Sequence, residues 1–274
     1  PYLREYIESS LSESLKSIGF EKCLIQDLNK CFDDFNFEYF KNKYASLLDD
    51  VQELNFHRKI LPNIYKMCVL PLIPKAEKVL DLGCGNGILS KILLEAGNCK
   101  EIVGIDVVEY PEWNEFRNKK LDYKLVERKD FNKFILDYSP DVVVLTWVLH
   151  HMEFNEQQQY LCEMKKILKN GATIVILEDS YSEKLNPKIG LEHHKLFMEF
   201  SPEDRLTIMS VLDFVSNRVL SRERTCPITF TYRTLEKWKQ VFESTGFNVV
   251  SVDYLGFPTP KNINTPQSVL VAKL

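Results

Sequence analysis

Three glycines at every second position follow a short apolar stretch in "VLDLGCGNG", Val79 to Gly87. The chain of 274 residues has only ten glycines, so three within five positions mark a backbone that must turn sharply. The stretch before them has the pattern of a strand, and "GILSKILLEAG" after them has the pattern of a helix. This order is typical of a nucleotide-binding turn, because glycine lets a ligand approach and the helix N-terminus offers free N–H groups. The alternative is a tight packing turn without a ligand.

Short apolar runs, separated by segments long enough for a helix, continue beyond this turn. The runs are "KVLDL", "EIVGID", "YKLVE", "DVVVLTW" and "ATIVILE". Strands that are apolar on both faces and alternate with helices form parallel sheets covered on both sides. We therefore predict an α/β fold with a doubly wound, mainly parallel sheet of about seven strands.

The regions on either side of this pattern read as helical. Residues 1–75 contain one glycine, Gly19, and apolar residues at helical spacing, and Pro71 and Pro74 end this region. We expect a helical N-terminal cap over 1–75 and the α/β domain over 76–274. After Glu178 the alternation stops for about fifty residues of helical pattern, so we expect a helical lid insertion at about 180–228. A further helix and two strands end the chain.

The glycine spacing distinguishes between two kinds of nucleotide. Dinucleotide folds use G-x-G-x-x-G, whereas this turn has G-x-G-x-G preceded by Asp81. With this motif the sequence resembles the class I S-adenosylmethionine-dependent methyltransferases, well over residues 76–180 and more loosely over the last two strands. The resemblance implies S-adenosylmethionine as cofactor and an antiparallel end of the sheet. It places beside the amino acid part of the cofactor Asp81, Gly83, Cys84, Gly85 and Gly87.

The resemblance also implies roles for residues that follow the next strands. Asp106 is the first acid at the carboxyl end of the second run, where a carboxylate accepts hydrogen bonds from both ribose hydroxyls; Val107 lies beside it. After the third run, Asp130 would meet the adenine amino group and Phe131 would pack on the ring, although Phe131 could equally be a core residue.

At the end of the fourth run, "DVVVLTWVLHHM", Thr146 and Trp147 would border the methyl donor. Methyl transfer from a sulfonium is an in-line displacement, so a general base is needed only for an acceptor that starts protonated. Histidine suits that role near neutral pH. On a helix, His150 and His151 would point about 100° apart, and we prefer His151 as the catalytic candidate.

Two further catalytic candidates lie in and after the expected insertion. His194, in "EHH" beside His193, is one, with an exposed helix histidine as the alternative. Tyr232 is a possible second polar contact to the acceptor. Nearby arginines could hold a carboxylate or phosphate of an anionic acceptor, or could simply form a solvated helix face: Arg218, Arg222, Arg224 and Arg233.

The charge balance bears on the partner. A formal net charge of −4 and a pI near 5.9 argue against a broad nucleic-acid-binding face. We predict methyl transfer to an oxygen or nitrogen of a small molecule. RNA or protein methylation, a catalytically silent methyltransferase-like subunit and a nicotinamide-dependent oxidoreductase stay open as alternatives.

The cysteines and the longest apolar run bear on metal and membrane. Seven cysteines are scattered without zinc-site spacing, so we predict no metal and expect reduced thiols in a cytoplasmic protein. "VVVLTWVL" is far shorter than the ~18 residues of a membrane span, and the given chain shows no signal-peptide pattern. Nothing in the sequence indicates an oligomeric state.

Overall fold

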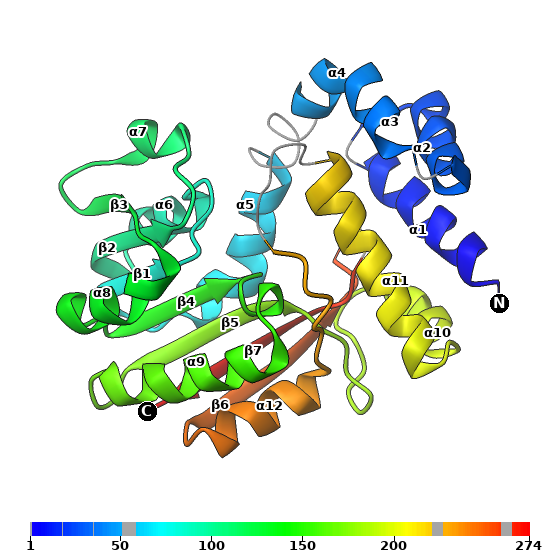
Figure 1. Cartoon of the computed structure of the whole chain (residues 1–274). Coiled ribbons are helices and arrows are strands. Elements are labelled where there is room, and N and C mark those ends of the chain that lie inside the picture. Colours follow the sequence, from blue (N-terminus) through cyan, green and yellow to red (C-terminus); the bar gives the residue numbers. More distant parts are fainter. Residues whose placement is uncertain (1, 18, 35, 51–58, 221–226, 259–264) are drawn as a thin grey trace.

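A computed structural model describes residues 2–17, 19–34, 36–50, 59–220, 227–258 and 265–274. It has a seven-stranded sheet in the order β3-β2-β1-β4-β5-β7-β6 (Figure 1). The strands are β1 (Ala76–Leu82), β2 (Cys99–Asp106), β3 (Leu121–Leu125), β4 (Val142–Thr146), β5 (Thr173–Asp179), β6 (Asn248–Gly256) and β7 (Gln267–Lys273). β1 to β5 pair in parallel, and β7 is antiparallel to both β5 and β6. The prediction of a mainly parallel seven-stranded sheet is confirmed, and β7 is the strand that runs against the others.

The central strands are apolar because helices cover both faces of the sheet. Every residue of β4 and β5 is buried, as a strand with two covered faces requires. The helices that follow the strands are α6 (Ile88–Glu95), α7 (Glu112–Phe116), α8 (Phe131–Tyr138), α9 (Phe154–Ile167) and α12 (Leu235–Ser244). Side chains of α8, α9 and α12 share one core cluster with one face of the sheet, and α6 packs in the cluster of the other face.

The N-terminal region and the segment after β5 are helical. Their helices are α1 (Leu3–Ser17), α2 (Lys22–Asp34), α3 (Phe37–Lys43), α4 (Ala45–Asp50), α5 (Leu61–Ile64), α10 (Leu191–Met198) and α11 (Pro202–Phe214). Wider π-helical turns extend α5 over Tyr65–Val69 and α11 over Val215–Leu220. In α1 the apolar residues Ile7, Leu11 and Leu15 recur at helical spacing and are buried.

These helices gather at the carboxyl ends of the central strands. α11 packs against α1, and the two lie beyond the ends of β4 and β5 in Figure 1. Tyr65, from the turn after α5, reaches Thr146 at the end of β4. In open α/β sheets this edge is where ligands bind. Within the described part of the chain, no helix has the length and apolarity needed to cross a membrane.

Candidate active site

The turn between β1 and α6 is fastened to β2 by backbone hydrogen bonds. The N–H groups of Gly83 and Cys84 donate to the carbonyl of Ile105 at 2.8 and 3.1 Å. Gly83, Gly85 and Gly87 have φ values of 72°, 52° and 81°, in the left-handed region that favours glycine. The three glycines are therefore required by the path of the backbone.

Gly85 and Gly87 differ in what surrounds them. A Cβ on Gly87 would lie 2.4 Å from the ring of Tyr123, whose hydroxyl donates to the Gly87 carbonyl at 2.8 Å. A Cβ on Gly85 would meet no atom of the described part of the chain within 4 Å. Gly87 thus serves packing, whereas Gly85 borders open space that a ligand can enter.

Asp106 ends β2 directly opposite this open space. Its Oδ2 accepts the N–H of Gly85 at 2.8 Å, and its Oδ1 accepts the N–H of Val108 at 3.1 Å. These bonds hold the carboxylate in one orientation at the carboxyl end of β2, and a carboxylate can accept about four hydrogen bonds. The neighbouring side chain of Val107 is half exposed.

Asp81, the acid before the glycines, is fully buried at the end of β1. Its Oδ2 accepts the hydroxyl of Ser90 at 2.6 Å, while its Oδ1 has no hydrogen-bond partner among the described residues. Burial raises the pKa of Asp81 to about 7; the Ser90 bond opposes this rise and nearby Asp106 adds to it. A buried carboxylate oxygen without a partner is costly, and an ammonium group such as that of an amino acid would satisfy it.

A pocket of about 250 Å³ lies between the ends of β2 and β3. It is lined by Val107, Leu125, Val126, Glu127 and Arg128. The side chains of Val107 and Leu125 are exposed, so apolar surface is available here to a flat ring. Sequence reasoning did not predict that Leu125 to Arg128 would line a pocket. The signal that could have indicated it is the apolar Leu125 at the last position of β3.

The predicted adenine contacts lie just beyond this pocket. Asp130 is exposed in a 3₁₀ turn, Arg128–Asp130. Phe131 is 4% exposed and packs in the core cluster with Leu80 and Val103. The structure therefore places Phe131 in the core, which was the alternative interpretation of this residue.

The end of β4 brings Thr146 and Trp147 toward the cap. Thr146 is buried, with its hydroxyl 3.4 Å from that of Tyr65. Trp147 has a φ of 55°, which is uncommon for a residue other than glycine. Its Nε1 donates to Oε1 of Gln267 at 2.5 Å, and its ring lies 5.8 Å from that of Tyr65. Backbone strain of this kind clusters at functional sites.

His150 is buried in the 3₁₀ turn Leu149–His151 that follows β4. Its Nδ1 lies 2.6 Å from Oε2 of Glu178, and Oε1 of Glu178 accepts the N–H groups of Val148 and Leu149 at 3.0 and 2.7 Å. Burial by itself lowers the pKa of His150, but the charge and hydrogen bond of Glu178, together with nearby carboxylates, raise it to about 9.

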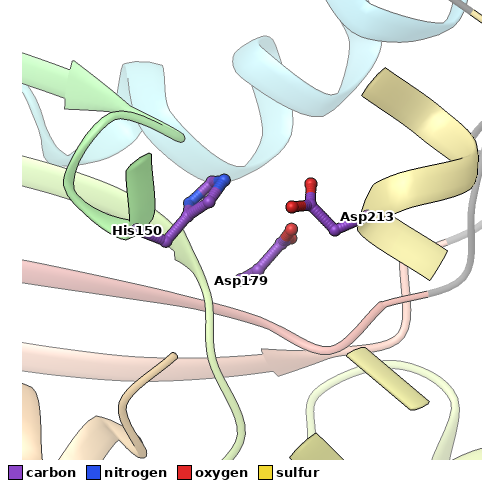
Figure 2. A group of neighbouring side chains, drawn as sticks. All are labelled: His150, Asp179 and Asp213. Atoms are coloured by element: carbon purple, nitrogen blue, oxygen red, sulfur yellow. The ribbon is translucent and has the colours of Figure 1, made fainter. Parts of the chain in front are cut away.

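Two more buried carboxylates face His150 (Figure 2). Asp179, at the end of β5, accepts hydrogen bonds from Thr265 and Gln267. Asp213, on α11, accepts from Asn217 at 2.6 Å and from the hydroxyl of Tyr232 at 2.8 Å. Burial raises the pKa of Asp213, which His150 partly opposes. One ligand atom each of His150, Asp179 and Asp213 lie within 4.8 Å of one another.

His150, Glu178, Asp179, Asp213 and Tyr232 together form a buried cluster, and one of the predicted catalytic residues belongs to it. Tyr232 is in it, and its ring stacks 5.8 Å from that of His150. Nδ1 of His151 instead lies 2.7 Å from the carbonyl of Pro227. His194 pairs with the hydroxyl of Tyr254 at 2.9 Å, and burial lowers its pKa. The ring of His151 nevertheless lies 4.2 Å from that of His150, and the catalytic roles of His151, His194 and Tyr232 stay predictions.

Three acids of the cluster were missed by the sequence reasoning. Glu178 and Asp179 end the otherwise apolar run "ATIVILED", and two acids after such a run are a signal that could have found them. Asp213 lies within α11 and has no distinguishing pattern.

The predicted anion-binding arginines have other contacts. Arg233 donates to Oε1 of Gln157 at 2.6 Å and to the carbonyl of Phe154. Arg218 donates to the carbonyl of Asn217. Arg222 and Arg224 lie outside the described residues.

Comparisons with known proteins agree on one family. Residues 80–176 match the family described as "Methyltransferase domain". An uncharacterized methyltransferase of Geobacillus sp. (strain WCH70) is 27% identical over 206 residues, which are 74% of this chain and 93% of that protein. The ubiquinone biosynthesis O-methyltransferase of Pelagibacter ubique is 32% identical over 110 residues, which are 37% of this chain but only 42% of its own length.

Solved structures share the fold. A SAM-dependent methyltransferase from Archaeoglobus fulgidus has a TM-score of 0.53 at 15% identity, covering 84% of this chain and all of that one. The Burkholderia thailandensis 1,6-didemethyltoxoflavin-N1-methyltransferase, solved with S-adenosylhomocysteine, has a TM-score of 0.51 at 15% identity, covering 85% of this chain and 86% of that one.

Proposed function

The chain belongs to the class I S-adenosylmethionine-dependent methyltransferases and uses S-adenosylmethionine as its cofactor, and we propose that it methylates an oxygen or nitrogen of a small molecule. The predicted methyltransferase activity and cofactor are thereby confirmed at the level of the family. The glycine spacing and the family match leave the nicotinamide-dependent alternative without support.

We assign the cofactor to the carboxyl ends of β1 and β2. In this proposal the unpartnered Oδ1 of Asp81 meets the ammonium of the cofactor, which its burial and missing partner favour. Asp106 accepts the ribose hydroxyls from its fixed position beside Gly85. The adenine ring enters the pocket between Val107 and Leu125. Thr146 and Trp147 border the side from which the acceptor approaches.

One observation carries the choice of a small acceptor: the polar groups beyond the cofactor turn are buried beneath helices. His150 and Asp213 are each 3% exposed and Tyr232 is 4% exposed. A strand of RNA or a folded protein needs an open surface, whereas a small molecule can be enclosed. We take residues 1–75 and about 180–228 as the cap and lid that enclose it, since Tyr65 and Asp213 extend from them to this edge.

Bound S-adenosylmethionine supplies an already activated methyl group, so the chain itself has to orient the acceptor and exclude water. The buried cluster can do both. Its carboxylates accept hydrogen bonds from a hydroxyl or amine, and Tyr232 and Trp147 add rigid apolar surface. An anionic acceptor stays a prediction that depends on the arginines near the lid.

A transfer experiment tests this proposal. The protein is incubated with methyl-labelled S-adenosylmethionine and a cell extract separated by dialysis into small molecules and retained macromolecules. We expect a labelled product in the dialysable fraction that chromatography separates from S-adenosylmethionine and its breakdown products, and no such product with an Asp106→Ala variant. Label in retained RNA or protein would overturn the small-molecule assignment. Cofactor binding without a labelled product in either fraction would favour a silent methyltransferase-like subunit.

A further inference from the structure

Three side chains from separate elements converge near the carboxyl end of β4 (Figure 2). His150 comes from the turn after β4, Asp179 from the end of β5, and Asp213 from α11. One nitrogen and two carboxylate oxygens lie within 4.8 Å of one another, and all three residues are buried. We propose that His150, Asp179 and Asp213 bind a divalent transition-metal ion. This proposal does not depend on the identity of the methyl acceptor.

The distances are compatible with a shared ion. Bonds of about 2.0–2.2 Å to nitrogen and oxygen place neighbouring ligand atoms roughly 3–3.5 Å apart. The limit of 4.8 Å in this structure therefore requires a contraction on the order of 1 Å, which small side-chain rotations supply.

Each ligand is already oriented by a second hydrogen-bonding group. The Nδ1 of His150 faces Glu178, whose other oxygen is fixed by two backbone N–H groups. This arrangement leaves Nε2 of the imidazole for the ion, and a carboxylate behind a histidine ligand is the usual support of such sites.

The two carboxylates are supported in the same way. Thr265 and Gln267 donate to Oδ1 of Asp179. Asn217 and Tyr232 donate to the two oxygens of Asp213. A carboxylate has about four lone-pair sites on its two oxygens, so it can accept two hydrogen bonds and also bind a metal ion.

The charge within the cluster favours a cation. Glu178, Asp179 and Asp213 are buried together with one imidazole. Like charges held close in a buried site are costly, and a doubly charged ion among these groups offsets that cost.

The ligand types select the metal. One imidazole nitrogen with two carboxylate oxygens suits Zn²⁺, Mn²⁺, Fe²⁺ or Co²⁺, whereas Mg²⁺ prefers oxygen ligands and retains its waters. Three protein ligands also leave coordination positions open to water or to an oxygen of the acceptor.

The test is metal binding by the full chain after dialysis against a chelator. We expect calorimetric titration to show one Zn²⁺ or Mn²⁺ ion bound per chain and much weaker binding of Mg²⁺. Added Co²⁺ should give visible absorption bands of a bound ion. His150→Ala and Asp213→Asn should abolish these signals, and Glu178→Gln should weaken binding about 10- to 100-fold through the histidine.

Two matched variants control for general effects. His193→Ala removes a histidine of α10 that pairs with Glu13 at the surface. Asp204→Asn changes a carboxylate in the first turn of α11 that accepts a hydrogen bond from Ser201. Neither change should alter metal binding. Binding of S-adenosylhomocysteine is measured on every variant, because it reports an intact fold through other residues. Retained S-adenosylhomocysteine binding with no metal binding by the wild type would overturn the metal site and leave the proposed function standing. Metal binding that persists unchanged in His150→Ala and Asp213→Asn would also overturn it.

Discussion

The backbone N–H of Gly85 donates to Oδ2 of Asp106 at 2.8 Å, joining the glycine turn after β1 to the end of β2. The bond spans 21 positions of the sequence. It holds the carboxylate proposed for the ribose beside the backbone proposed for the amino acid part of the cofactor, so the two halves of the cofactor site are built as one unit.

Asp106→Ala should therefore abolish tight binding of S-adenosylhomocysteine. The variant loses both ribose contacts and the bond that orders Gly85, and charge-assisted hydrogen bonds are each worth about 1.5–3 kcal/mol. We expect affinity to fall by at least a hundredfold in a calorimetric titration. Asp122→Ala, which changes the partly exposed partner of Arg117 on β3, is the control and should bind as the wild type does. Equal affinity of the two variants would refute the role of Asp106.

Gly85→Ala and Gly87→Ala should separate ligand binding from folding. Both glycines have positive φ, so each alanine costs about 1–2 kcal/mol of strain. Only the Cβ at Gly87 meets Tyr123, and overpacking adds about 1–3 kcal/mol there. Urea unfolding should show the larger loss for Gly87→Ala.

The loss of S-adenosylhomocysteine affinity, measured on the folded fraction of each variant, should show the opposite order. The Cβ at Gly85 projects into the open space assigned to the cofactor, so Gly85→Ala should lose more S-adenosylhomocysteine affinity per unit of stability lost. If Gly87→Ala weakened binding more than Gly85→Ala at equal folded fraction, the cofactor would not lie against Gly85.

The sequence predicted those features that neighbouring residues determine. The strands followed from continuous apolar runs, and the glycine turn followed from a contiguous motif with its own strand and helix. Asp106 followed from its place as the first acid after the second run, and its role stays a prediction. The preference for His151 assumed an α-helix directly after β4. The chain instead has a left-handed Trp147 and a 3₁₀ turn, so the direction of each histidine could not be obtained from helical spacing.

The buried cluster was beyond sequence reasoning for a different cause. His150, Asp179 and Asp213 are separated by about thirty residues each, as their numbers show, and only the packing of α11 over the sheet brings them together. The expectation of no metal rested on cysteine and histidine spacing, which carries no information about side chains that three distant elements bring together; it stays a prediction, and the metal titration decides between it and the proposed site.

Glu178→Leu should destabilise the protein more than Glu178→Gln. The carboxylate accepts the N–H groups of Val148 and Leu149 and faces His150. Glutamine keeps one carbonyl oxygen for the backbone donors, whereas leucine leaves buried donors without acceptors, at about 1–3 kcal/mol each. Urea unfolding of the metal-free protein should show an additional loss of about 2–4 kcal/mol for leucine. Equal unfolding free energies would mean that Glu178 does not hold this turn.

Asp81→Asn should stabilise the cofactor-free protein, and increasingly so as the pH rises. Burial raises the pKa of Asp81 from 3.8 to about 7, so the folded state binds this proton more tightly than the unfolded state does. The wild type therefore loses stability from this group as the pH rises from about 4 to about 7, because in that range the carboxyl is already ionised in the unfolded state while the buried carboxyl keeps its proton. Asparagine cannot ionise and does not show this loss.

The difference in unfolding free energy between Asp81→Asn and the wild type should therefore increase by about 2–3 kcal/mol from pH 5 to pH 8, at about 1.4 kcal/mol for each pH unit up to the folded pKa. Urea unfolding at the two pH values measures it, with Asp122→Asn, at the partly exposed partner of Arg117 on β3, as the control variant. The same variant should bind S-adenosylhomocysteine more weakly, because the neutral amide no longer attracts an ammonium. A stability difference that stayed constant with pH would show that Asp81 ionises normally, and tighter cofactor binding would place the ammonium elsewhere. The expected combination, a more stable protein that binds its cofactor less well, identifies the buried charge as one that the fold tolerates for the sake of the ligand.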